Sequence, residues 1–173
     1  MITPSQLKNI LIFQDLDLEQ LEMILPLVEE AEYNARDVIY RKGQPAQNLY
    51  CLLEGKAVLE DDISPLASIS LSALKPGYVF GWYSLLPSGT YSYTPVCTDP
   101  CRVLIIPREK LLKVLDDNPD MGYLIMRRTF EILKLRLDHR TSQFLSLLSM
   151  HPDLRELVQA DSLTPDRPED EDA

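Results

Sequence analysis

Hydrophobic and polar positions follow helical spacing at both ends of the chain and strand-and-turn spacing between them. The Thr-Pro pair that opens residues 3–11 predicts a capped short helix, and Asp17 with Gln20 forms a capping-box pattern before a second one. Pro26 lies inside the apolar run of that second helix, where we expect it to kink or shorten the helix. The N-terminal segment is therefore predicted to be helical.

Between about residues 30 and 106 the apolar runs are short and are separated by turn residues. Residues 38–40 predict one strand. Residues 49–53 and 57–59 flank a turn at Glu54 and Gly55, and this arrangement predicts a hairpin. Many short strands at this regular spacing along the chain favour a barrel or jelly roll.

Helical patterning returns after Pro107. Residues 108–115 predict one short helix, and Asn118 followed by Pro119 predicts the start of a long one. Along the long helix, apolar residues recur every four or three positions in a seam interrupted by one threonine. The seam comprises Met126, Phe130, Leu133, Leu137, Thr141, Phe144 and Leu148.

Together these elements predict an α+β fold that is mainly β. We expect a jelly-roll (double-stranded β-helix) barrel flanked by N-terminal helices and a long C-terminal helix. Residues 1–150 are expected to form one domain that includes the long helix. A short helix and an acidic tail are expected over residues 151–173.

The net charge of the chain excludes some classes of binding partner. The net charge is −10, of which residues 161–173 carry −5. Because nucleic-acid binding depends on neutralising phosphates, an acidic body argues against a nucleic-acid partner. No apolar run approaches the roughly 18 residues that span a bilayer, and the start of the chain lacks a secretory signal pattern. We therefore expect a cytoplasmic protein that has no membrane contact.

Cysteine and histidine are too few and too scattered to predict a metal centre. Cys97 and Cys101 have poor spacing for a zinc site, and only His139 and His151 could complete one. A cupin-like enzyme would need clustered histidines, and no pattern of nucleophile and base appears either. We therefore expect no metal, no cofactor and no enzymatic activity.

Four segments resemble the cyclic-nucleotide-binding domain of the catabolite-activator (cAMP receptor protein) family. They are residues 12–16, 37–43, 49–56 and 74–81, and the resemblance extends roughly over residues 10–150. It implies the jelly-roll fold predicted above. Arg36 departs from the family, which commonly has a turn glycine there, and this change costs the fold little if the turn is remodelled.

The resemblance fails at the charged residues that hold a cyclic nucleotide in this family. Trp82 stands where the family has a glutamate for the ribose hydroxyl, and no arginine occurs between Arg41 and Arg102 to pair with the phosphate. Lys75 is the only charged residue in the segment 63–98. A charge-assisted hydrogen bond contributes about 1.5–3 kcal/mol. Loss of the arginine alone is therefore expected to weaken binding by at least about ten- to a hundredfold.

The candidate ligand site is this degenerate, uncharged cassette. Gly81 would let backbone N–H groups approach an anion at the start of a short helix. The aromatic residues nearby either pack into the core and plug the pocket, or line a pocket for a neutral or weakly polar ligand of unknown identity. The site comprises Gly81, Trp82, Tyr83, Ser84, Leu85, Tyr91, Ser92 and Tyr93.

We interpret the chain as a non-catalytic regulatory or ligand-sensing module that acts through another ligand or a protein partner. The alternative is a genuine cyclic-nucleotide-binding signalling protein that uses a non-standard cassette. A transcription regulator of this family needs a helix-turn-helix after the long helix. Only 24 residues follow Ser149, so we expect no DNA-binding domain.

The resemblance also implies a homodimer joined through the long helix. The seam could instead pack only on its own barrel, because amphipathic helices usually face their own core. The expected dimer residues are Met126, Phe130, Leu133, Leu137 and Phe144.

Overall fold

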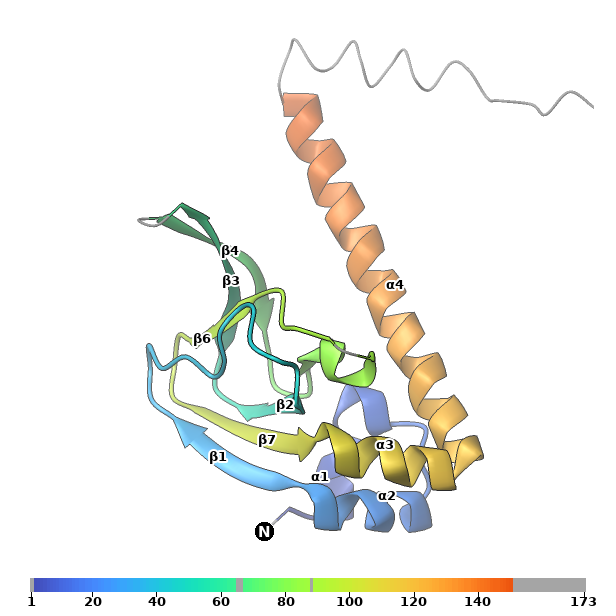
Figure 1. Cartoon of the computed structure of the whole chain (residues 1–173). Coiled ribbons are helices and arrows are strands. Elements are labelled where there is room, and N and C mark those ends of the chain that lie inside the picture. Colours follow the sequence, from blue (N-terminus) through green and yellow to red (C-terminus); the bar gives the residue numbers. More distant parts are fainter. Residues whose placement is uncertain (1, 65–66, 88, 151–173) are drawn as a thin grey trace, which may run out of the picture. The chain divides into compact units, whose positions relative to one another are not determined.

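The computed structural model describes residues 2–64, 67–87 and 89–150. Within them, helices come first, strands follow, and helices return at the C-terminal end (Figure 1). The helices and 3₁₀ turns are α1 (Pro4–Lys8), η1 (Leu11–Phe13), α2 (Leu18–Ile24), η2 (Leu25–Leu27), η3 (Trp82–Leu85), α3 (Arg108–Asp117) and α4 (Pro119–Met150). The strands are β1 (Glu29–Tyr33), β2 (Asn48–Glu54), β3 (Ala57–Ser64), β4 (Ala67–Leu74), β5 (Val79–Phe80), β6 (Thr94–Cys97) and β7 (Cys101–Pro107).

The two N-terminal helices begin at the predicted caps. The side chains of Thr3 and Asp17 each accept a hydrogen bond from the backbone N–H three residues on, and the glutamine there accepts one in return. Helix α2 ends at Ile24 and Pro26 lies in the following 3₁₀ turn, so the expected shortening is confirmed. Helix α1 ends at Lys8, earlier than predicted, and the backbone N–H of residue 11 donates to the Gly77 carbonyl oxygen in the turn between β4 and β5 instead of continuing the helix.

The strands form two antiparallel sheets, which confirms the jelly-roll type of barrel expected from the short apolar runs. One sheet has the strand order β1-β7-β2-β5 and the other has the order β4-β3-β6. Neighbouring strands are often distant in the chain, as with β2 and β7. The fold is therefore α+β and mainly β, with helices before and after the barrel.

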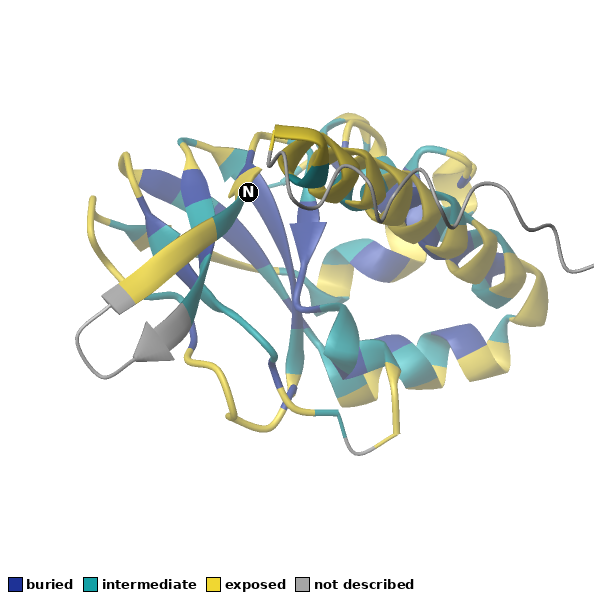
Figure 2. Cartoon of the chain, turned by 90° about the horizontal axis from the view of Figure 1, so that it is seen from above, coloured by how far each residue is buried: buried dark blue, intermediate teal, exposed yellow. Residues whose placement is uncertain are grey.

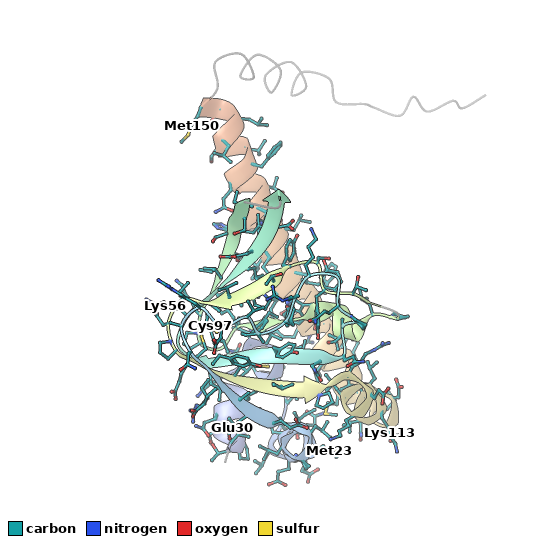
Figure 3. The ribbon with its side chains drawn as sticks, turned by 60° about the vertical axis from the view of Figure 1, so that its left-hand side comes forward. Met23, Glu30, Lys56, Cys97, Lys113 and Met150 are labelled. Atoms are coloured by element: carbon teal, nitrogen blue, oxygen red, sulfur yellow. The ribbon has the colours of Figure 1, made fainter. Side chains whose placement is uncertain are left out.

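The predicted hairpin around Gly55 is wrong, because β2 and β3 belong to different sheets. Strand β2 pairs with β5 and β7, whereas β3 pairs with β4 and β6. Gly55 has a φ of 87°, and a Cβ placed there would lie 2.1 Å from the carbonyl oxygen of Pro100. The turn thus passes the chain from one sheet to the other, at the end of the barrel where Lys56 and Cys97 lie together in Figure 3.

The segment before β2 differs from the sequence expectation in two ways. Residues 38–40 form no strand, and Val38 makes only an isolated bridge with Val96. Arg36 adopts a left-handed φ of 74°, so its turn is not remodelled around the larger residue. Non-glycine residues are strained in this region. The Arg36 N–H donates to the Cys97 carbonyl oxygen at 2.7 Å, which helps to hold this conformation.

Buried side chains form two clusters on opposite faces of the first sheet, and Figure 2 shows the buried residues in dark blue. We call the first the helix-side cluster. It is largely aliphatic and joins α1, α2, α3 and the start of α4 to strands that include Leu104 and Ile106. We call the second the barrel cluster. It contains side chains from both sheets, among them Tyr50, Leu59 and Val103. Successive side chains along β2 and β7 point to opposite faces of the sheet, so each of these strands contributes residues to both clusters.

Helix α4 begins at Pro119, as predicted, and extends to Met150. Contacts divide the chain into two units, of which the first is Met1–Thr129 and the second begins at Phe130, so α4 contributes residues to both. None of the described helices is long and apolar enough to cross a membrane. The short helix and acidic tail expected over residues 151–173 lie outside the described residues.

Candidate functional site

The corner between β5 and η3 lies directly against strand β2. Gly81 caps η3 with a left-handed φ of 77°, a conformation that glycine adopts without strain. A Cβ at this position would lie 3.0 Å from the Asn48 carbonyl oxygen and 3.0 Å from the Tyr50 ring. Glycine is therefore needed here both for its φ and for close packing against β2.

Four aromatic rings occupy the barrel beside Gly81. Tyr40 and Tyr91 stack with ring centroids 3.8 Å apart, and Tyr50 and Phe80 stack at 5.4 Å. Tyr40 also lies 5.0 Å from Tyr50, so the two pairs form one group. All four side chains are buried. We call Tyr40, Tyr50, Phe80 and Tyr91 the four-ring group.

Tyr91 is fixed by its hydroxyl as well as by its ring. The hydroxyl donates to the Asn48 carbonyl oxygen at 2.9 Å and lies 3.0 Å from the Asn48 backbone nitrogen, whose N–H it accepts. Burial raises the pKa of the Tyr91 phenol above its ordinary value, so the side chain is neutral at physiological pH. A neutral phenol thus binds the strand backbone next to Gly81.

The structure separates the predicted site residues into two environments. Trp82 and Leu85 pack against the helix-side cluster. Tyr83 and Tyr93 are half-buried against the barrel cluster, to which Tyr91 belongs. Ser84 is fully buried, and within the described part of the chain its hydroxyl has no hydrogen-bond partner. Ser92 is half-buried.

Tyr40, Tyr50 and Phe80 were not among the predicted site residues. Each lies inside a segment that carried the family resemblance, so the sequence contained a signal: aromatic residues at interior positions of three separate segments. Only the assembled sheets bring those positions together, since β2 and β5 are paired and Tyr40 comes from the preceding loop.

A cavity of about 250 Å³ opens beside the four-ring group. It is open to solvent, and its lining includes Gln44, Gln47 and Asn48 together with the small exposed parts of Tyr40, Tyr50 and Tyr91. Ile39 and Pro45 complete the lining, so no charged side chain faces this space. The arrangement suits an uncharged occupant better than a phosphate.

Two basic side chains of the barrel, Lys42 and Arg102, are paired with carboxylates. Lys42 Nζ lies 2.6 Å from Asp61 Oδ1. Arg102 places Nη2 2.6 Å from Glu54 Oε1 and Nη1 3.7 Å from Glu30 Oε2. An anionic ligand that paired with Lys42 or Arg102 would have to displace a carboxylate. The cost of breaking the existing ion pair would reduce the net binding free energy of that ligand.

Among the described residues, no three His, Cys, Asp or Glu side chains are grouped as a metal site would require. The three cysteines are reduced and buried. Burial raises the pKa of the Cys97 thiol to about 12, with a further contribution from its hydrogen bond with Cys101. The Cys97 thiol is therefore protonated, and all three buried cysteines act as small core side chains.

The expected dimer residues on α4 are exposed in the single chain. Phe130 is 71% exposed and Leu137 is 66% exposed. Met126, Leu133 and Phe144 are also largely open to solvent. The dimer remains a prediction, and this row of apolar side chains is the surface on which it depends.

Comparisons with known proteins agree with the fold. The sequence profile of the cyclic nucleotide-binding domain matches residues 30–118. The "Global nitrogen regulator" of Nostoc sp. is 32% identical over 104 residues, which cover 59% of this chain and 46% of that protein. The corresponding regulator of Synechocystis sp. is 29% identical over 61% of this chain. The chain spans about half the length of these curated relatives, 46% and 47% respectively.

Solved structures are similar over most of the chain. A putative cyclic nucleotide-binding protein from Geobacter metallireducens is 29% identical, with a TM-score of 0.70 over 79% of this chain and 99% of that one. The catabolite activator protein of Thermus thermophilus is 28% identical, with a TM-score of 0.65 over 80% of this chain and 62% of that one.

Proposed function

Since the chain belongs to the cyclic nucleotide-binding domain family, we propose that it is a non-catalytic regulatory module whose barrel does not use a cyclic phosphate as its signal. The module acts through another small ligand or a protein partner, and it self-associates along α4. The observation that carries the proposal is the four-ring group, which occupies the barrel beside Gly81. The regulators among the relatives support a regulatory rather than an enzymatic role.

The four-ring group leaves too little space for a nucleotide next to Gly81. The Tyr50 and Tyr91 rings lie 3.0 and 3.4 Å from where a Cβ of Gly81 would stand. A ligand that approached this backbone would have to displace both rings. It would also break the two hydrogen bonds between Tyr91 and Asn48. Each such bond contributes about 0.5–1.5 kcal/mol net, so this displacement opposes nucleotide binding.

The absence of charged ligand contacts opposes nucleotide binding in addition to the lack of space. The segment 63–98 contains no arginine and no carboxylate, and Trp82 replaces the glutamate that the family resemblance implies for the ribose. Trp82 packs on the helix-side cluster, away from the four-ring group. Both losses act in the same direction, because neither the phosphate nor the ribose of a cyclic nucleotide gains a charged partner.

Titration calorimetry with cAMP and cGMP at low salt tests the proposal directly. Low salt is the fair condition because it preserves any residual attraction to phosphate. We expect no binding tighter than about 100 µM, since the charge-assisted contacts are missing. Micromolar binding would refute the proposal and support the alternative of a cyclic-nucleotide-binding signalling protein with a non-standard cassette.

Self-association along α4 rests on the exposed apolar row. Met126, Phe130, Leu133, Leu137 and Phe144 recur at spacings of three, four and seven residues, which keeps them on one face of a helix. A face of this kind is stabilised by a second copy of the same helix, and the family resemblance implies that contact. A homodimer would bury side chains that the single chain leaves exposed.

Leu137→Asp and Leu135→Asp form a matched pair for testing the dimer. Both leucines lie on α4 and both are 66% exposed, but only Leu137 belongs to the apolar row. Light scattering after chromatography should show a dimer for the wild type and for Leu135→Asp, and a monomer for Leu137→Asp. A wild-type monomer at tens of micromolar, or equal loss in both variants, would refute the contact.

A further inference from the structure

We infer that the open edge of strand β4 binds an extended strand of a partner protein, and that a basic side chain of this strand pairs with Glu60. This inference rests on the proposed function, because it names the kind of protein partner through which the module acts. Two observations support it: an uncharged strand edge that has no neighbour, and a carboxylate beside that edge that has no basic partner among the described residues.

The outer part of the β3–β4 hairpin is a ribbon of only two strands. Strand β3 pairs with β6 as far as Glu60, and beyond this residue it pairs with β4 alone. Figure 1 shows the hairpin reaching beyond β6. A ribbon of two strands is marginally stable in water and is stabilised by a third. An added strand on the β4 side would continue the sheet.

Strand β4 is the least protected edge among the strands that the structure describes. Strand β1, at the edge of the other sheet, carries Glu29, Glu30 and Glu32, and charged side chains of this kind discourage pairing with another chain. The outer edge of β6 is hydrogen-bonded to residues 36–39, and β5 has only two residues. Strand β4, in contrast, contains neither a charged residue nor a proline.

The backbone of the ribbon offers hydrogen bonds to such a strand. Among the described residues, the backbone of residues 68–70 has hydrogen-bonding partners only in β3. Its groups that face away from β3 can therefore donate to and accept from an added strand. Leu71 is the extra residue of a β-bulge, which bends the edge. We therefore expect the contact over residues 68–70 rather than along the whole of β4.

Glu60 gives this edge a preference for positive charge. Its half-buried carboxylate accepts a hydrogen bond from the Ser68 hydroxyl at 3.3 Å, and no basic side chain of the described residues pairs with it. The neighbouring Asp61 is already paired with Lys42. Ser70 lies directly opposite Glu60 on β4. Because these serine side chains are short, a lysine or arginine of the added strand can reach across β4 to the Glu60 carboxylate.

Capped heptapeptides that differ only at their middle residue test this assignment. Their other positions alternate threonine and valine, which favour an extended strand, and the middle residue is lysine, glutamine or glutamate. Titrations of the full chain, followed by its backbone amide resonances, should show the lysine peptide shifting the signals of residues 68–70 with millimolar affinity. The glutamine peptide should bind about two- to fivefold more weakly, and the glutamate peptide more weakly again. A lysine peptide with N-methylated backbone groups should not bind, because it cannot complete the ladder of hydrogen bonds.

Glu60→Gln and Glu32→Gln provide matched variants. Each removes one negative charge from a strand, but only Glu60 lies beside the β4 edge, since Glu32 belongs to β1. In Glu60→Gln the preference for the lysine peptide over the glutamine peptide should fall below about twofold, whereas Glu32→Gln should retain it. This pair accounts for the general attraction of cations to a chain with a net charge of −10. Binding of the N-methylated peptide, shifts centred on β1, or equal effects of the two variants would overturn the assignment.

The outcomes separate this inference from the proposed function. Micromolar cAMP binding would remove the proposed function whatever the peptides do. Weak or absent cAMP binding together with no peptide binding at β4 would remove only this kind of partner. The regulatory module would then have to act through a small ligand or through another surface.

Discussion

The helix-side cluster and the barrel cluster are built on opposite faces of one sheet, yet they differ in chemistry. The helix-side cluster consists almost wholly of aliphatic side chains such as Leu104 and Ile106, which need no polar partner. The barrel cluster contains phenols, and the hydroxyl of Tyr91 is satisfied by the Asn48 backbone. Aliphatic packing tolerates many sequences, whereas buried phenols fix one arrangement. The first cluster thus stabilises the fold, whereas we propose that the second determines which ligands the barrel can hold.

Leu104→Ala should produce the largest effect, in the helix-side cluster. Leu104 is fully buried on β7, so truncation leaves a cavity and should lower the free energy of unfolding by about 2–5 kcal/mol. Urea denaturation measures this loss. Leu135→Ala on the exposed surface of α4 is the control and should cost less than about 0.5 kcal/mol. Similar losses in both variants would contradict the assigned role of this cluster.

Tyr91→Phe tests the polar anchoring of the barrel cluster. The ring stays, but the N–H and carbonyl of Asn48 lose their partner, so stability should fall by about 1–3 kcal/mol in thermal or urea unfolding. Tyr93→Phe makes the same chemical change at a half-buried tyrosine whose hydroxyl makes no hydrogen bond among the described residues. It should change stability by less than about 0.5 kcal/mol. Equal losses would show that the Tyr91 hydroxyl adds nothing.

Introducing charged cassette residues should not restore nucleotide binding while the four-ring group stays in place. The double variant Trp82→Glu, Ser92→Arg should bind cAMP no better than the wild type, because the four-ring group still occupies the barrel. Adding Tyr91→Ala should improve the affinity by at least about tenfold, which corresponds to about 1.4 kcal/mol. Calorimetry measures both variants, after circular dichroism has checked their folding.

Tyr40→Ala replaces Tyr91→Ala in this test if the triple variant does not fold, because Tyr40 is the stacking partner of Tyr91. If the double variant alone gains tenfold, the barrel interior is open and the four-ring group does not exclude nucleotides.

Of the effects predicted here, the smallest is a loss of unfolding free energy at alkaline pH that arises from Tyr91 in the barrel cluster. The pKa of Tyr91 is raised above its ordinary value of 10.0, chiefly by burial, so folding favours the neutral phenol. Its contribution is complete below about pH 10 and is lost as the pH rises further. At about pH 10.5 the loss should be under about 1 kcal/mol. Urea denaturation at several pH values should show a shallower alkaline decline in Tyr91→Phe than in Tyr93→Phe. Equal declines would contradict the role of Tyr91.

Local features of the fold were predictable from the sequence. The capping boxes at Thr3 and Asp17 form because both partners lie within four residues, so no distant segment can change the outcome. Gly43, Gly55 and Gly77 have left-handed φ values, which glycine adopts readily in the turns that separate short strands. The repeated short strands indicated a barrel for the same reason, since strand length and turn chemistry are local properties.

The pairing of strands was less predictable. Two apolar runs around Gly55 look like a hairpin, and only the competing partners β7 and β4 decide otherwise. The same limit applied to the four-ring group. Tyr40, Tyr50 and Phe80 are scattered along the chain, and nothing in the local pattern states which way each ring faces until the sheets are assembled. The sequence alone showed that the cassette lacks charged ligand contacts. That four aromatic rings occupy the barrel became visible only in the folded structure.

The passage of the chain from one sheet to the other at Gly55 also has a consequence for how the protein folds. Neither sheet is made from a continuous stretch: β1, β2, β5 and β7 form one, and β3, β4 and β6 form the other. Among the strands that the structure describes, only β3 and β4 are neighbours in both chain and sheet, so they are positioned to pair early. All other pairings require distant segments to meet, which slows folding and makes it cooperative. A fragment that ended between β3 and β6 would therefore lack strands of both sheets, and the barrel should be synthesised whole before it becomes stable.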